Sequence, residues 1–211
     1  MDVIGSMITS LSTDRRVLAL LVAWCFGGFM EGMSGFGTAV AIPAGMLAAL
    51  GFPALQAVLI CLVANGVPTC FGSVGVPTVS LAGLTGLDPV RLAFTEMVQL
   101  APFFVIVPFI VVFLAAETGE ECAPGAGVGT RLGGVWHIAL ASGVAYALPS
   151  LAVAAFVGPE LTVVVGSLCS LIVTALLARV RARHATSIAW RSHRPRRRPW
   201  QVPCVHGRAL S

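Results

Sequence analysis

Charged residues are scarce in this chain, at 10% of its 211 residues, and none occurs between Gly32 and Leu87. Soluble domains are about a quarter charged and about half apolar, whereas this sequence is 57% apolar with a mean hydropathy of +0.92. One crossing of a bilayer needs only ~20 apolar residues, so the uncharged stretch is long enough for more than two. This composition leaves no room for a soluble domain before the C-terminal tail and indicates an integral membrane protein.

Paired cysteines are also lacking. The six cysteines are scattered singly and form no C-x-x-C motif, so the sequence predicts neither a disulfide framework nor a metal site, and we expect no cofactor. A cleavable signal peptide is not indicated either. Arg15 and Arg16 precede an apolar run, but no small-residue cleavage pattern follows, so we interpret this run as a retained membrane element.

Apolar runs and the residues that interrupt them predict an all-α integral membrane protein with about five or six hydrophobic helical segments. The predicted segments are residues 17–30, 38–51, 54–64, 92–116, 132–157 and 161–178. Two Gly/Pro-rich motifs interrupt this pattern, at 31–37 and at 64–78 (ANGVPTCFGSVGVPT). Proline and glycine inside apolar sequence break helices, so both motifs are predicted to be broken or re-entrant helices.

The charges divide the chain into three parts: an N-terminal segment (1–16), a membrane region (17–178) and an Arg-rich tail (179–211). The tail holds nine of the thirteen arginines and no acid, so its net charge is +9 against −5 for the rest. Arginines in short loops stay on the cytoplasmic side, so both termini are predicted to be cytoplasmic, with Arg131 inside and Asp88 outside. The tail could bind anionic lipid, but its irregular sequence favours an unstructured end without a nucleic-acid partner.

Non-helical backbone at membrane depth must be buried in protein or line a wet cavity. Secondary transporters use such broken helices to bind anionic substrates, because half-helix N-termini carry free N–H groups and partial positive charge. We therefore predict a site for a small carboxylate at the two motifs, with Ser34 and Thr38 capping the second half-helix. The predicted substrate-binding residues are Ser34, Gly35, Gly37, Thr38, Asn65, Thr69 and Ser73.

Glu31 is the acid within the first motif. A carboxyl group in a partly desolvated site can load and release a proton near physiological pH. A proton carried with the anion cancels its charge and removes an opposing ~2.3 kcal/mol per 100 mV of inside-negative potential. Glu31 is thus predicted to couple transport to protons, although Na⁺ coupling stays open. The alternative is a carboxylate that reaches the headgroups or caps backbone N–H groups.

The segment EGMSGFGTAVAIPAGMLAALGFPALQAVLICLVANGVPTCFGSVGVPT (31–78) resembles the L-lactate permease family. That family carries E-G-x-x-G-F-G-x-P-V-A-I, a G-F-P-type turn and N-x-x-P-x-x-F-G-x-x-G-x-P in this order, and FVGPELTVVVGSLCSL (156–171) is similar to a further family segment. The matching positions are Glu31, Gly32, Gly35, Phe36, Gly37, Asn65, Pro68, Phe71, Gly72, Gly75 and Pro77. Two positions depart from the pattern: Ala39 replaces a proline, and MVQLA before Pro102 lacks an arginine.

The resemblance implies proton symport of small 2-hydroxymonocarboxylates, such as L-lactate, D-lactate or glycolate, across the bacterial inner membrane. It covers roughly residues 20–178, and permeases of this family are much longer, so the chain resembles an interior portion of a larger transporter fold. Its expected partners are the carboxylate, the proton and the lipid bilayer, and a second permease half or another copy of the chain is a further candidate. A non-transporting fragment or assembly partner of a split permease is therefore one alternative.

An intramembrane serine protease is a further alternative. GMSG (32–35) fits the G-x-S-G pattern of such enzymes, and His137 could act as the base for Ser34. Short patterns arise easily in Gly-rich membrane sequence, and the permease resemblance explains the same residues. We therefore expect a transporter, not an enzyme.

Overall fold

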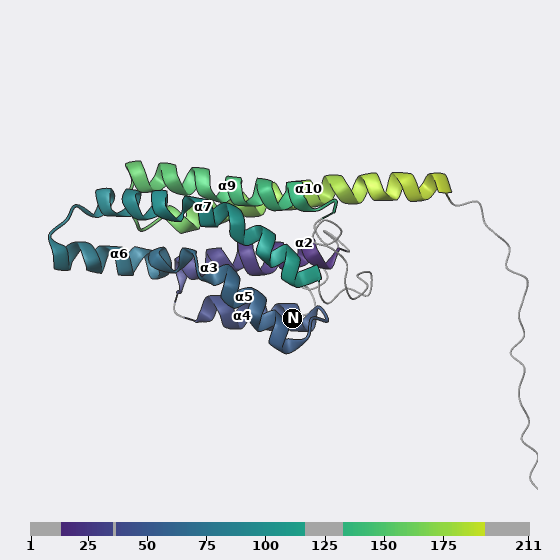
Figure 1. Ribbon diagram of the computed structural model, residues 1–211, viewed down its shortest axis with the longest axis horizontal. Helices are drawn as coiled ribbons and strands as arrows, with labels where there is room; N and C mark the ends of the chain where they lie inside the picture. Colours follow the sequence, from purple (N-terminus) through teal and green to yellow (C-terminus); the bar gives the residue numbers. More distant parts are fainter. Residues whose placement is uncertain (1–13, 36, 117–132, 193–211) are drawn as a thin grey trace, which may run out of the picture.

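The computed structural model describes residues 14–35, 37–116 and 133–192, with the backbone alone for 182–192. Within these ranges the regular structure is entirely helical and forms an elongated bundle (Figure 1). Among the described residues, four helices are long and apolar enough to cross a membrane, and one bent helix pair is a fifth candidate. The predicted all-α membrane class is confirmed.

The first span is continuous from Arg15 to Met33. It consists of α2 (Arg15–Ala19), a π-helical segment η1 (Leu20–Phe26) and α3 (Gly27–Met33). Asp14 caps its start, because the Asp14 carboxylate accepts the Arg16 N–H at 3.1 Å, which satisfies one of the free donors of the first turn. Because α3 continues to Met33, Glu31 lies inside the last turn of this helix and not in the break after it.

Both Gly/Pro-rich motifs interrupt helices, as predicted. The segments around them are α4 (Thr38–Ala49), α5 (Ala54–Asn65), the 3₁₀ turn η2 (Pro68–Phe71) and α6 (Gly72–Thr85). The first motif separates α3 from α4, which is too short to cross a membrane at 12 residues. The second motif bends the α5–α6 pair by 65°.

The last three helices that the described residues form are α7 (Pro89–Ala116), α9 (Trp136–Phe156) and α10 (Thr162–Ser192). The helix that ends the chain's described part continues beyond the predicted end at 178. The boundary of the Arg-rich tail is therefore corrected: its first residues, from Arg179 to Ser192, are helical. Arginine is a good helix former, so the helix can continue once it has left the hydrocarbon. Residues 193–211 lie outside the described part.

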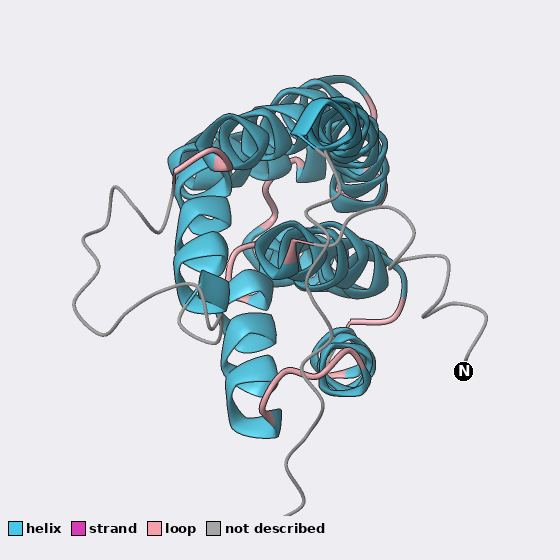
Figure 2. Cartoon of the chain, turned by 90° about the vertical axis from the view of Figure 1, so that its right-hand side faces the viewer, coloured by secondary structure: helices cyan, strands magenta, loops and turns pink. Residues whose placement is uncertain are grey.

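Helices α7, α9 and α10 form one layer, the α2–α3 span lies beneath it, and α4 and α5 lie on the outer side (Figure 1). Figure 2 looks along the bundle and shows several helices end-on. Close approach of α7 and α9 depends on Gly143, where a Cβ would lie 2.7 Å from the Phe104 carbonyl oxygen. Pro108 leaves that carbonyl without its usual helical donor, so the small residue packs where the α7 backbone is interrupted.

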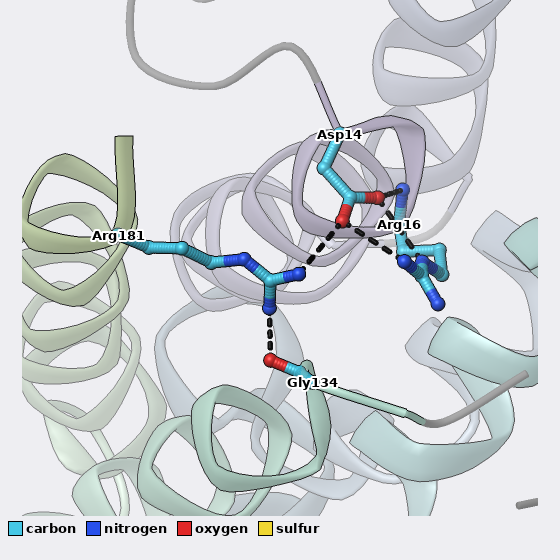
Figure 3. A network of polar contacts seen from close by, with 4 residues as sticks. All are labelled: Asp14, Arg16, Gly134 and Arg181. Carbon is cyan, nitrogen blue, oxygen red and sulfur yellow. Dashed lines mark hydrogen bonds and ion pairs between the residues drawn. The ribbon is translucent and has the colours of Figure 1, made fainter. Parts of the chain in front are cut away.

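A polar cluster holds one end of the bundle together (Figure 3). The Asp14 carboxylate pairs with Arg16 at 3.1 Å and with Arg181 at 3.5 Å. Arg181 also donates to the Gly134 carbonyl, just before α9. The start of α2, the start of α9 and Arg181 of α10 therefore lie at the same end, which we call the Asp14 end. Arg131, in the preceding loop, lies outside the described residues.

Candidate functional site

The first break begins where α3 ends. The backbone N–H groups of Ser34 and Gly35 both donate to the Met30 carbonyl, at 2.8 and 3.3 Å. Gly35 (φ +60°) and Gly37 (φ +98°) take left-handed conformations, which glycine adopts without steric cost. The predicted capping by Ser34 and Thr38 is wrong, because Gly37 precedes the first turn of α4 and no side chain caps it.

The second break contains a left-handed turn of three successive residues, Ser73 (φ 47°), Val74 (φ 59°) and Gly75 (φ 74°). A β-branched residue such as Val74 rarely adopts positive φ, and such strain persists only where the surrounding structure fixes it. The α9–α10 turn helps to hold this conformation, because a Cβ on Gly75 would lie 2.9 Å from the Pro159 backbone. The second break therefore packs against the turn at the C-terminal end of α9.

The two breaks lie against each other. The Ser73 hydroxyl donates to the Ser34 carbonyl at 2.9 Å. A Cβ on Gly35 would lie 2.3 Å from Ser73 Oγ, so only glycine fits there. One turn before Gly35, the Glu31 side chain occupies the space beside Gly72, where a Cβ would lie 2.3 Å from Glu31 Oε1. We call this region, made of Glu31, Ser34, Gly35, Gly72 and Ser73, the break junction.

Glu31 is the buried acid of the break junction, with 1% of its surface exposed. The Asn65 side chain approaches the carboxyl group, but neither carboxyl oxygen has a hydrogen-bond partner within the described residues. A buried, unpaired carboxylate is very costly. The Glu31 carboxyl group is therefore expected either to hold a proton or to receive a binding partner from outside the described residues.

The predicted site residues are not all at the junction. Glu31, Ser34, Gly35, Asn65 and Ser73 are brought together. Gly37 is exposed and has no atom near the position of a Cβ, and Thr38 is half-buried at the start of α4. The exposed Thr69 donates to the Asn65 carbonyl at 2.5 Å. Of these three residues, Thr69 is joined to the junction through Asn65.

Sequence reasoning missed the contribution of α9 and of the aromatic residues next to Glu31. Tyr146 lies over Gly28, where a Cβ would be 2.3 Å from the tyrosine hydroxyl. Its ring packs on Trp24 and Phe104 at centroid distances of 5.1 and 4.7 Å. Tyr146 is the chain's only tyrosine, and its position in the middle of an apolar helix was the one available signal. The close packing also fits the G-x-x-x-G pair that begins at Gly28.

A second acid, Glu96 of α7, has a hydrogen-bond partner. Its carboxyl oxygen is 2.7 Å from the hydroxyl of Thr78 in α6, and that hydroxyl is also 3.0 Å from the Cys70 carbonyl. Glu96 therefore ties α7 to the helix that follows the second break.

The arrangement excludes a Ser34–His137 catalytic pair. His137 is exposed near the start of α9, three residues after Gly134 and close to the Asp14 end. Ser34 follows the opposite end of the 19-residue first span, roughly 28 Å away at 1.5 Å per residue. A serine and its general base must be within hydrogen-bond reach.

These features define a class: a multi-pass helical membrane protein in which two broken helices meet at a buried acid, as in secondary transporters. A family model described as L-lactate permease matches residues 1–197. The chain belongs to the L-lactate permease family.

Relatives carry the same names. The chain is 45% identical to an L-lactate permease of Streptococcus iniae over 183 residues, 87% of this chain and 36% of the relative. It is 35% identical to an L-lactate permease of Bacillus subtilis (81% and 28%) and 33% identical to the glycolate permease GlcA of Escherichia coli (85% and 30%). It thus spans about a third of the length of these relatives. No solved structure matches the chain.

Proposed function

We propose that this chain takes part in the proton-coupled transport of a small 2-hydroxymonocarboxylate, with L-lactate and glycolate as the first substrates to test. The relatives are named as L-lactate and glycolate permeases, which supports this class of substrate. The bacterial inner membrane is the proposed location.

The observation that carries the proposal is the unpaired, buried carboxyl group of Glu31 at the break junction. A protonated Glu31 is neutral and tolerates the low-dielectric surroundings, whereas its anion needs a partner. A substrate carboxylate that arrives with a proton adds no net charge to the membrane interior. Net movement is then not opposed by the ~2.3 kcal/mol per 100 mV that a lone anion meets on entering the cell.

The substrate reaches the junction from its open side, where Ser34, Gly37 and Thr69 are exposed. The N-terminal end of α4 points its partial positive charge toward this side, and the glycines let a carboxylate approach the backbone closely. Glu31 is buried beneath this surface. The substrate therefore contacts the backbone of the two breaks, while the Glu31 carboxyl group binds and releases the proton.

The proposed topology places the Asp14 end on the cytoplasmic side. Arg16 and Arg181 come from opposite ends of the described chain and both pair with Asp14 there. Because arginines near membrane spans stay inside, their joint location supports both chain ends facing the cytoplasm.

The test is uptake of radiolabelled L-lactate by cells that lack lactate carriers and express the full 211-residue chain, with and without a protonophore. Wild-type uptake should be protonophore-sensitive. Glu31→Gln should abolish accumulation, whereas Glu160→Gln, which changes an exposed carboxylate in the α9–α10 turn, should not. Uptake that is absent from cells with the protein in the membrane, or unchanged in Glu31→Gln, would contradict the proposal.

A further inference from the structure

A line of buried hydroxyl groups continues behind Glu31 toward the Asp14 end. We call it the hydroxyl seam. Its members, all from α9 and α10 and each fully buried, are Ser142, Tyr146, Ser150, Ser167, Ser170 and Thr174. The seam lies where these two helices face the first span.

Printed contacts fix the order of the seam along the bundle. Cys25 of η1 lies beside Ser142, and Gly28 of α3 lies beside Tyr146. The first span and α9 therefore run in the same direction, and one further turn brings Ser150 level with Glu31. Helix α10 runs the opposite way, with Val164 beside Gly32 and Thr174 beside Cys25.

The part of the seam toward the Asp14 end is a closed hydrogen-bond network. The hydroxyl oxygens of Ser142 and Ser170 are 2.9 Å apart, and the Ser170 hydroxyl is also 2.9 Å from the Ser142 carbonyl. The Cys25 thiol lies 3.4 Å from Ser170 and 3.6 Å from Thr174. The Ser142 and Ser170 oxygens are close enough to exchange a proton, and the Cys25 sulfur bridges Ser170 and Thr174.

The part of the seam next to Glu31 is different, because its hydroxyl groups are unpaired. Within the described residues, the Tyr146 hydroxyl and Ser150 Oγ have no hydrogen-bond partner. Ser167, whose hydroxyl donates to the Val164 carbonyl at 2.9 Å, lies close to Tyr146. Small polar residues that only join helices are normally satisfied across the interface. Leaving buried hydroxyl groups unsatisfied is unfavourable, so the hydroxyl groups of Tyr146 and Ser150 are suited to bind water or to pass on a proton.

We propose that the hydroxyl seam is the relay that carries the coupling proton between Glu31 and the Asp14 end; this inference rests on the proposed function. Each hydroxyl oxygen, and the Cys25 sulfur between Ser170 and Thr174, accepts one proton and passes on its own, so one proton is displaced and only O–H and S–H bonds form and break. The substrate reaches the break junction from its exposed side, and the proton leaves Glu31 on the side that faces α9 and α10. In this conformation the relay stops at Thr174, because the next two turns, about 10 Å, pass the buried Ala178. A carrier needs such a closure, since a relay open to both sides would leak protons.

The experiment uses the full chain in proteoliposomes and two assays. One is exchange of labelled external for unlabelled internal L-lactate at equal pH, which needs no net proton transfer. The other is uptake driven by an imposed pH gradient. The variants are Tyr146→Phe, which keeps the ring that packs on Trp24, and Ser170→Ala. Thr162→Val is the control, because its buried hydroxyl donates to the Gly158 carbonyl, away from the seam.

Tyr146→Phe and Ser170→Ala should each lower gradient-driven uptake at least tenfold and leave exchange within about twofold of wild type, while Thr162→Val changes neither. Wild-type gradient-driven uptake should also slow in D₂O. If both seam variants take up lactate at the wild-type rate, or lose exchange and uptake equally, the relay is refuted and the proposed function stands. A wild-type chain that is silent in both assays refutes the proposed function and the relay with it.

Discussion

Replacing Gly72 by alanine tests whether the second break is shaped around the Glu31 carboxyl group. Gly72 has φ −63° and ψ 158°, a conformation that alanine adopts without strain. The added methyl group would lie 2.3 Å from Glu31 Oε1 and 3.2 Å from Glu31 Cδ. Any effect of Gly72→Ala therefore arises from the contact with Glu31 and not from the backbone.

The size of the effect follows from these distances. The carboxyl oxygen must move by about 1 Å to reach ordinary contact at 3.4 Å, and overpacking of this kind costs ~1–3 kcal/mol. For a chain of this length, that corresponds to a fall in Tm of roughly 2–12 °C. Lactate uptake should fall with it, because the carboxyl group is displaced from its position against the second break.

The assay is thermal unfolding of purified protein in detergent, followed as a double-mutant cycle with Glu31→Ala. Removing the side chain of Glu31 also removes the clash, so the double variant should regain most of the stability lost in Gly72→Ala, a coupling of at least ~1 kcal/mol. Gly72→Ala with wild-type stability, or an equal loss in the Glu31→Ala background, would refute the packing argument.

Three further predictions concern the rest of the bundle. Gly143→Ala should destabilise the chain by about 3 kcal/mol, because its methyl group meets the α7 backbone and not a flexible side chain; Gly45→Ala, at a site with open space, should be neutral or stabilising by up to ~1 kcal/mol in the same unfolding assay. Glu96→Gln should keep the tether between α6 and α7, since an amide can donate to the Thr78 hydroxyl, whereas Glu96→Ala should lose ~1 kcal/mol of stability in detergent; equal stability of the two variants would contradict this. Arg181→Ala should cost less than ~1 kcal/mol, because its ion pair is partly exposed, and a larger fall in Tm would mean that this cluster does more than join the helix ends.

The helices and their breaks could be predicted from the sequence because both follow from local signals. Long apolar runs specify membrane helices, and the glycines and prolines at 31–37 and 64–78 mark where they stop. The acid at Glu31 was also identifiable, because an uncharged sequence surrounds it. The position of this acid inside the last turn of α3, and the use of Gly37 in place of a side-chain cap, depend on backbone conformations that composition does not specify.

The rest of the site could not be predicted because it depends on contacts between residues far apart in the chain. Nothing local in Ser34 or Ser73 indicates that one donates to the carbonyl of the other. Tyr146 and Ser150 lie in an apolar helix, where an isolated polar residue is usually explained by packing against a neighbouring helix. The extension of α10 beyond 178 could not be predicted, because the sequence after this residue has no helical periodicity and contains prolines further on.

Infrared difference spectroscopy of the chain in lipid, recorded before and after addition of L-lactate, shows whether the protonation of Glu31 responds to substrate. We expect a change in the C=O band of a protonated carboxyl group that is absent from Glu31→Gln and present in the Glu160→Gln control. A lactate-induced spectrum without a carboxylic-acid band, or one whose band persists in Glu31→Gln, would contradict the claim that Glu31 carries the coupling proton at the break junction.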